Sequence, residues 1–188
     1  KNFYSKVDKA INWMEQLYDH DSGKVPNLGA NDGSRILNLH SLEYDNYKAT
    51  IQTSRNIFSA YRRFKKGIWD LASYNLRLKD NLPVKSLQKK SSILDKSYGI
   101  LKGNSNTWGL IRLPRFIFRP KHNDIFHFDL WYNGNNIFCD SGSFSYWDKD
   151  GEKFKSIKSH NSVSFGGKEQ MGKISKFLLK DWINSDHN

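Results

Sequence analysis

Three polar side chains in the C-terminal half of the sequence are of the types that bind zinc. His122 opens the run HNDIFHFDLW, Asp140 lies in FCDSGS and His160 lies in SHNSV. Zinc takes imidazole nitrogen and carboxylate oxygen in a tetrahedral shell, and three protein ligands leave one position for water or substrate. The wide spacing matches no compact zinc-finger pattern. Ordinary polar side chains at strand ends and in loops are therefore the alternative.

Amphipathic helices are predicted in the N-terminal part of the chain. Apolar residues recur at helical spacing over residues 2–19, and they are Val7, Ala10, Ile11, Met14 and Leu17. A second helix is predicted over residues 46–66, with a buried face made of Ile51, Ile57, Phe58, Ala60 and Tyr61. A shorter third helix covers residues 67–76. Between the first two, residues 21–33 combine a proline with several glycines and predict a long structured loop.

The pattern changes after residue 83 to short aromatic and β-branched segments separated by Gly, Asn and Pro. These segments are SYGILKG, TWGLIRL, DIFHFDLWY, NNIFCDS and NSVSFGG. Such a series predicts an antiparallel sheet. The sequence therefore predicts an α+β chain, with a helical segment over residues 1–80 and an antiparallel β domain over residues 81–188.

Alternation along HNDIFHFDL indicates how the first histidine is placed. If this run is one strand, His122 and Phe126 lie on one face and His127 lies on the other. The first face is polar at its start and apolar along its length. His122 is then predicted at the edge of a core, where an unpaired imidazole is costly. His127 is predicted on the opposite, solvated face.

The charge of the chain favours acidic partners. Thirty Lys and Arg against 19 Asp and Glu give a net charge of +11, which attracts polyanions such as nucleic acid and acidic polysaccharide. The basic residues are scattered and form no nucleic-acid reading motif. No run of about 20 apolar residues predicts a membrane span, and no signal peptide is visible, which leaves periplasmic and cytoplasmic locations open. Because the chain begins at Lys1, we expect a fragment.

Five stretches in order carry a resemblance to a known family over residues 25–182. They are PNLGANDGSRILNL, YDNYKATIQ, RPKHNDIFHFDLWYNGNNIFCDSGSFSYW, SHNSVSFGGKEQM and KFLLKDW. Together they resemble the heparinase II/III-like family of bacterial polysaccharide lyases, particularly members from surface-polysaccharide gene clusters. The resemblance implies an (α/α) toroid followed by an antiparallel β-sandwich, with the polysaccharide cleft between them. This chain would hold the last toroid helices and the first sandwich strands.

The resemblance also implies a zinc site and an elimination reaction. The family's zinc ligands correspond to His122, Asp140 and His160, and the metal is expected to be structural. Lyases of this family act on acidic glycans, such as glycosaminoglycans, by β-elimination across a uronic acid. One residue neutralises the carboxylate, a base removes a proton, and an acid protonates the leaving oxygen. Asn31 in GANDG matches the neutralising residue, although a turn role before Asp-Gly is the alternative.

Tyrosine and histidine normally serve as base and acid in this family. The candidate tyrosines are Tyr44, Tyr47 and Tyr146, and packing with a bonded hydroxyl is the alternative for each. A tyrosine base needs a nearby positive charge to lower its pKa, which Arg119, Lys121 or Lys48 could supply. We expect Arg119, Lys121 and His127 to contact the substrate.

Two positions depart from the family pattern. Pro120 stands where several lyases carry a catalytic histidine, and Asp32 stands where some relatives carry another. Either His40 or His127 substitutes, or tyrosine acts alone, or the protein binds polysaccharide without cleaving it. The leading prediction is a lyase of acidic, uronic-acid-containing glycans. The alternative is a catalytically inactive glycan-binding or assembly protein of capsule or O-antigen biosynthesis. A nucleic-acid-binding domain would rest on charge alone.

Overall fold

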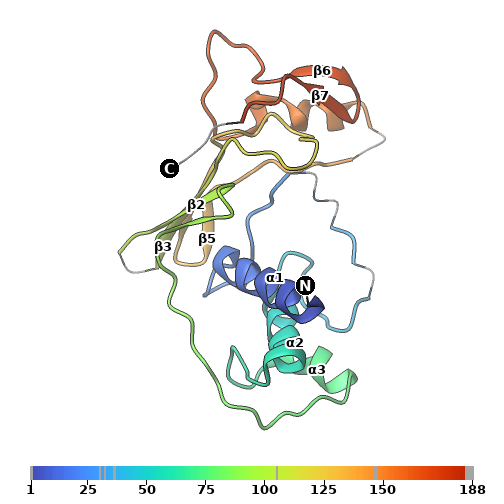
Figure 1. Cartoon of the computed structure of the whole chain (residues 1–188), viewed down its shortest axis with the longest axis vertical. Coiled ribbons are helices and arrows are strands. Elements are labelled where there is room, and N and C mark those ends of the chain that lie inside the picture. Colours follow the sequence, from blue (N-terminus) through green and yellow to red (C-terminus); the bar gives the residue numbers. More distant parts are fainter. Residues whose placement is uncertain are drawn as a thin grey trace. The chain divides into compact units, whose positions relative to one another are not determined.

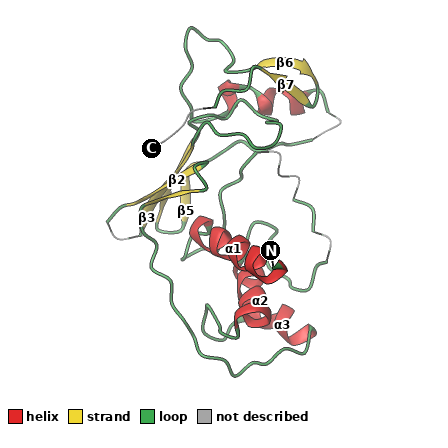
Figure 2. Ribbon diagram, viewed as in Figure 1, coloured by secondary structure: helices red, strands yellow, loops and turns green. Residues whose placement is uncertain are grey.

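The computed structural model describes residues 2–29, 31, 33–35, 37–104, 106–145 and 148–184. The chain divides into two compact units. Unit 1 comprises Lys1–Val25 and Gly33–Lys89, and unit 2 comprises Pro26–Asp32 and Lys90–Asn188. Helices fill unit 1 and strands lie in unit 2 (Figures 1 and 2). The predicted mixed α+β class is confirmed, whereas the toroid and the sandwich stay predictions.

Helix α1 spans Phe3–Leu17 and follows the predicted apolar stripe. The side chain of Asn2 accepts a hydrogen bond from the backbone N–H of Tyr4, which satisfies one of the free donors at the helix start. Ile11 and Leu17 are buried. Glu15 is buried on the same helix, so α1 brings a charged side chain into unit 1 as well as apolar ones.

Helix α2 spans Lys48–Ser59 and is shorter than the predicted 46–66, because Ala60 adopts a left-handed conformation with φ of 52°. Its predicted buried face is wrong in part, since Ile57 and Phe58 are exposed. The face that is buried instead is largely polar and consists of Ala49, Ile51, Gln52, Thr53, Arg55 and Asn56. A short 3₁₀ turn, η1 (Ile68–Asp70), and helix α3 (Leu71–Asn75) complete unit 1.

Unit 2 is built on a five-stranded antiparallel sheet in sequence order. Its strands are β1 (Ser92–Leu94), β2 (Tyr98–Lys102), β3 (Thr107–Arg112), β4 (Phe128–Tyr132) and β5 (Asn135–Phe138). Asn133 and Gly134 both have positive φ, as a two-residue type I′ turn between β4 and β5 requires. Trp108 and Trp131 are cross-strand partners, and their buried rings stack at 5.6 Å.

The rest of unit 2 is made of short elements. Two 3₁₀ turns, η2 (Asp150–Lys155) and η3 (Ile157–Ser159), precede a two-stranded hairpin of β6 (Gly172–Ser175) and β7 (Leu178–Lys180). Residues 161–167, predicted as a strand, form none. No helix in the part of the chain that the structure describes is long and apolar enough to cross a membrane.

The run from His122 to Leu130 is not one strand, because β4 begins only at Phe128. Phe126 has a φ of 61°, which breaks the alternation that the sequence predicted. Phe126 is therefore exposed, and His127 is buried, against the prediction of a solvated face. The prediction that His122 is buried is confirmed.

Candidate functional site

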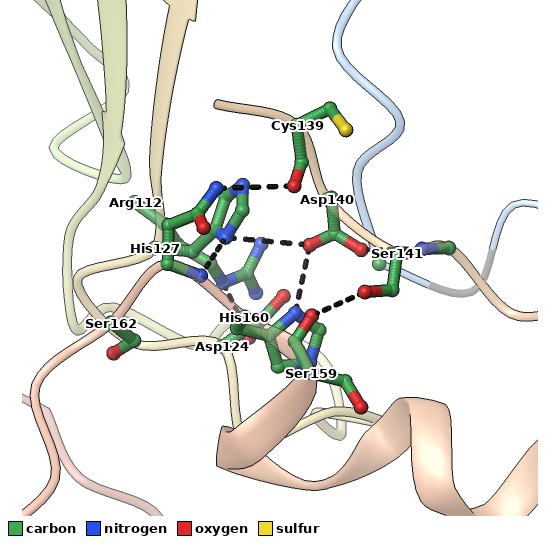
Figure 3. Close-up of polar contacts among 12 residues, drawn as sticks. Arg112, Asp124, His127, Cys139, Asp140, Ser141, Ser159, His160 and Ser162 are labelled. Carbon is green, nitrogen blue, oxygen red and sulfur yellow. Dashed lines mark hydrogen bonds and ion pairs between the residues drawn. The ribbon is translucent and has the colours of Figure 1, made fainter. Parts of the chain in front are cut away.

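Unit 2 contains a cluster of buried ionisable side chains at the start of β4 and in the loops that follow β5. Its members are His122, Asp124, His127, Asp129, Asp140 and His160, each with less than a tenth of its surface exposed. They come from the segment before β4, from β4 itself, from the turn after β5 and from the end of η3. Figure 3 shows Arg112, Asp124, His127, Asp140 and His160 converging. Buried ionisable groups are costly unless they are paired or bind an ion.

His127 has a partner for both ring nitrogens. The backbone N–H of Asn161 donates to Nδ1 at 3.1 Å, so the ring proton is on Nε2. Nε2 then donates to Asp129 Oδ2 at 3.1 Å. Asp129 Oδ1 accepts a second hydrogen bond from the Asn136 amide at 2.7 Å. This half of the cluster is thus saturated by protein partners.

His160 is held by one nitrogen only. Its Nδ1 lies 2.9 Å from Asp140 Oδ2, and a carboxylate acceptor places the ring proton on Nδ1. The other nitrogen, Nε2, is buried and has no hydrogen-bond partner among the described residues. A histidine whose Nδ1 is bound to a carboxylate presents a basic Nε2, which is the usual arrangement of a metal-binding histidine.

His122 is the least satisfied group of the cluster. Its ring centroid lies 5.5 Å from that of His160, and neither of its nitrogens has a hydrogen-bond partner within the described residues. Burial lowers the pKa of His122 to about 4, and the neighbouring His160 ring adds to this shift. The imidazole is therefore neutral at pH 7, which is the form that binds metals.

The donor set fits a metal ion. One ligand atom from each of His127, Asp140 and His160 lies within 4.8 Å of the others, and all three residues are buried. This triad could hold a metal ion. It contains two of the three ligands predicted from the sequence, Asp140 and His160, and adds His127. The role of His122 as a ligand stays a prediction, which its unpaired nitrogens support.

A cavity of about 440 Å³ lies beside this cluster, within unit 2. Its lining includes Asn31, the basic side chains Arg112, Arg115, Arg119 and Lys121, and the cluster members His122 and Asp124. Asn31, Arg119 and Lys121, which the sequence predicted to act on one substrate, thus line one cavity. Four cationic side chains against one carboxylate make its lining strongly basic.

Arg112 and Tyr98 line the same cavity, although no sequence motif pointed to them. The Arg112 Nη1–H donates to the Tyr98 hydroxyl at 2.8 Å, and its Nε lies 2.9 Å from Asp124 Oδ1. The Nε–Oδ1 contact is an ion pair without hydrogen-bond geometry. Burial raises the pKa of Tyr98 although Arg112 opposes the shift. Their pairing across β2 and β3 is the signal that could have found them.

Comparison with known proteins agrees with the resemblance inferred from the sequence. Residues 113–188 match the family described as heparinase II/III-like, C-terminal. The resemblance is thereby confirmed for this part of the chain, which contains every member of the buried cluster. No curated protein matches the chain.

Solved structures of heparinase III share the fold over most of the chain. A heparinase III with methylated lysines is 16% identical, with a TM-score of 0.55 over 85% of this chain and 23% of that protein. Another heparinase III structure is 18% identical, with a TM-score of 0.56 over 89% of this chain and 27% of that protein. The chain thus spans about a quarter of the length of these proteins, and such identities establish the fold alone.

The remaining predicted residues lie outside the heparinase II/III-like part or are not described. Tyr44 and Tyr47 belong to unit 1, where Tyr44 is half exposed and Tyr47 packs on an apolar cluster. Lys48 lies over the rings of Phe64 and Trp69 in the same unit. His40 also lies in unit 1, beside Arg35. Tyr146 and Asp32 lie outside the described residues.

Proposed function

We propose that this chain is part of a polysaccharide lyase-like protein that binds an acidic, uronic-acid-containing glycan in the cavity of unit 2. The observation that carries the proposal is the lining of this cavity, where Asn31 lies with Arg112, Arg115, Arg119 and Lys121. Cations bind the carboxylate or sulfate groups of such a glycan. The match of residues 113–188 to a heparinase II/III-like family supports the same substrate class.

In this proposal Asn31 neutralises the uronic carboxylate. Its amide donates hydrogen bonds to the charge that grows on the carboxylate as the neighbouring proton leaves. Tyr98 is suited to donate a proton rather than to accept one at neutral pH, because burial raises its pKa. Its hydroxyl is oriented by the bond from Arg112, and we assign it the protonation of the leaving oxygen. Tyr44, Tyr47 and Tyr146 stay predictions for the base.

The zinc ion of this proposal would be held by His122, Asp140 and His160 and would organise the wall of the cavity, with one Asp140 oxygen released from His160 Nδ1 to the ion. The support is the pair of unsatisfied imidazoles, because His127 already has partners on both nitrogens. Bound there, zinc would supply a fixed positive charge and would cross-link the segments before β4 and after β5. Zinc content of purified variants tests the assignment. His122→Ala should lose zinc and His127→Ala should keep it, and the reverse result would move the site to the His127 triad.

Elimination by the full protein is the direct test. Incubation with heparan-, hyaluronan- and alginate-type polysaccharides should produce the ultraviolet absorbance of an unsaturated product. Asn31→Ala should lower the rate by about 10²- to 10³-fold, the usual effect of removing one donor to a developing anion. Asn135→Ala, an exposed asparagine of β5, is the matched control and should leave the rate unchanged.

An inactive glycan-binding or assembly protein is the second candidate, and one observation favours it. Pro120 lines the cavity at the position where the family resemblance places a histidine, and proline cannot transfer a proton. Binding without product in all three polysaccharide assays would support this candidate. Absence of both product and binding would refute the glycan proposal in either form.

A further inference from the structure

The turn that follows Asp140 contacts the segment that carries Asn31, and both belong to unit 2. Gly142 has a φ of 76°, and a Cβ atom built on it would lie 2.3 Å from Asn27 Nδ2. The Asn27 amide therefore occupies the space that a side chain at Gly142 would need. Any other residue at Gly142 would push Asn27 away and would also be strained at this φ.

A hydrogen bond next to this contact fixes the same segment. The hydroxyl of Ser143 donates to the carbonyl of Gly29 at 3.2 Å. Ser143 is buried, with 7% of its surface exposed, so a lost partner would not be replaced freely by water. The carbonyl of Gly29 is only two residues from Asn31, whose side chain lines the basic cavity.

Asp140 connects this turn to the buried histidines. Its Oδ1 accepts a hydrogen bond from the Gly142 N–H at 2.7 Å, and its Oδ2 lies 2.9 Å from His160 Nδ1. One carboxylate thus fixes both an imidazole of the candidate metal centre and the turn that holds residues 27–29. A shift of Asp140 would therefore reach the segment of Asn31 through two short contacts.

We propose that Gly142 and Ser143 are positioning residues that hold residues 27–29 and thereby place the Asn31 side chain in the cavity. The proposal rests on the role given to Asn31 in the proposed function. Neither residue needs to touch the glycan. Their effect passes through Asn27 and Gly29, which they contact directly.

Hydrogen–deuterium exchange of the full protein tests the placement without any glycan. Ser143→Ala should speed exchange in peptides covering residues 27–31 about fivefold, as expected for the loss of one buried hydrogen bond. Ser143→Thr, which keeps the hydroxyl, should restore the slow exchange. Ser141→Ala is the matched control, because the Ser141 hydroxyl donates to the Ser159 carbonyl on the other side of the same turn. It should leave residues 27–31 unchanged.

A glycan-binding measurement then separates the two proposals. Ser143→Ala should weaken binding of the acidic polysaccharide while zinc content stays at the wild-type level. Unchanged exchange at residues 27–31 in both Ser143→Ala and Gly142→Ala would overturn the positioning role. Faster exchange at residues 27–31 in Ser143→Ala, together with no glycan binding by the wild-type protein, would uphold the placement of this segment and refute the proposed function instead.

Discussion

Both units bury charged side chains, but they satisfy them differently. In unit 1, Glu15 receives two hydrogen bonds from Arg55, at 2.8 and 2.7 Å, and two from Arg63, both at 2.8 Å. The remaining guanidinium nitrogens, Arg55 Nη1 and Arg63 Nη1, donate to Asp8 and to the Lys85 carbonyl, and Arg55 Nη2 also donates to Asn12. In unit 2, the described partners of His122 and His160 leave three buried ring nitrogens unpaired.

The difference separates a structural ion network from a binding site. In the Glu15 network every carboxylate oxygen and guanidinium nitrogen is hydrogen-bonded, so no polar atom is left to bind a ligand. The role of this network is to fix α1 against α2. Unpaired buried nitrogens lower the stability of the fold, because each costs about 1–3 kcal/mol. Such a cost is expected where a ligand completes the bonding. The unsatisfied cluster, rather than the more charged one, is therefore the candidate site.

The largest effect is expected in the saturated network of unit 1. Glu15→Gln would leave Arg63 buried without its counter-charge and Arg55 with Asp8 alone, and should lower the free energy of unfolding by about 3–5 kcal/mol. Asp8→Asn is the matched control, because Asp8 is half exposed and bonds only one nitrogen of Arg55. Its cost should stay below about 1 kcal/mol. Urea unfolding followed by circular dichroism measures both, and equal losses would contradict the comparison.

Zinc should stabilise unit 2 and leave unit 1 unchanged. At a free zinc concentration 100 times the dissociation constant, binding contributes about 2.7 kcal/mol to the folded state. Hydrogen exchange should therefore slow around His122, Asp140 and His160 when zinc is added to chelated protein, and stay constant in α1 and α2. Equal slowing in both units, or none in either, would show that the unpaired nitrogens do not mark a metal site.

A smaller loss is expected from the saturated half of the unit 2 cluster. Asp129→Ala removes the acceptor of both His127 and Asn136 and should cost about 1–3 kcal/mol, with zinc content unchanged. Asn136→Ala, which removes only one of these hydrogen bonds, should cost less. Zinc loss in Asp129→Ala would instead make His127 a ligand with Asp129 as its orienting partner. Metal analysis and urea unfolding of the two variants decide between these outcomes.

Sequence periodicity predicted helices well where their buried faces are apolar. Helix α1 follows its stripe of Ile11 and Leu17, and its bounds lie within two residues of the prediction. The buried face of α2 was wrong because Arg55 and Gln52 are buried by specific partners. Arg55 binds Glu15 from another helix, and Gln52 binds the backbone at Phe64. Such pairings depend on tertiary contacts that periodicity does not encode.

The candidate site was predicted in part for a similar reason. Ligand chemistry and the family resemblance brought forward Asp140 and His160, which lie in one buried cluster. Strand alternation places His127 on a solvated face only if it runs through Phe126, whose left-handed φ interrupts it. Arg112 and Tyr98 were missed because each is an ordinary strand residue until the β2–β3 register pairs them.

The pH dependence of the two units gives the finest test of their difference. Burial alone would raise the pKa of Glu15, but hydrogen bonds from Arg55 and Arg63 outweigh it and hold the pKa below its ordinary value of 4.5. The stabilising effect of this network is thus fully present above pH 4.5 and is lost as pH falls through the lower pKa of the folded state. In unit 2, burial lowers the pKa of His122 from 6.5 to about 4, so the unfolded state takes up this proton first and the stability of the cluster falls as pH drops from 6.5 toward 4.

Between pH 6.5 and pH 5 the two units should therefore separate. Hydrogen exchange in chelated protein, corrected for the intrinsic pH dependence of exchange, should rise around Asp140 and His160 over this interval and stay flat in α1 and α2. Glu15→Gln removes the carboxyl that titrates in unit 1. Hydrogen exchange in α1 and α2 of this variant should therefore show no additional rise below pH 4.5. A simultaneous rise in both units near pH 6.5 would mean that the Glu15 network and the histidine cluster belong to one cooperative structure, and the contrast between them would fail.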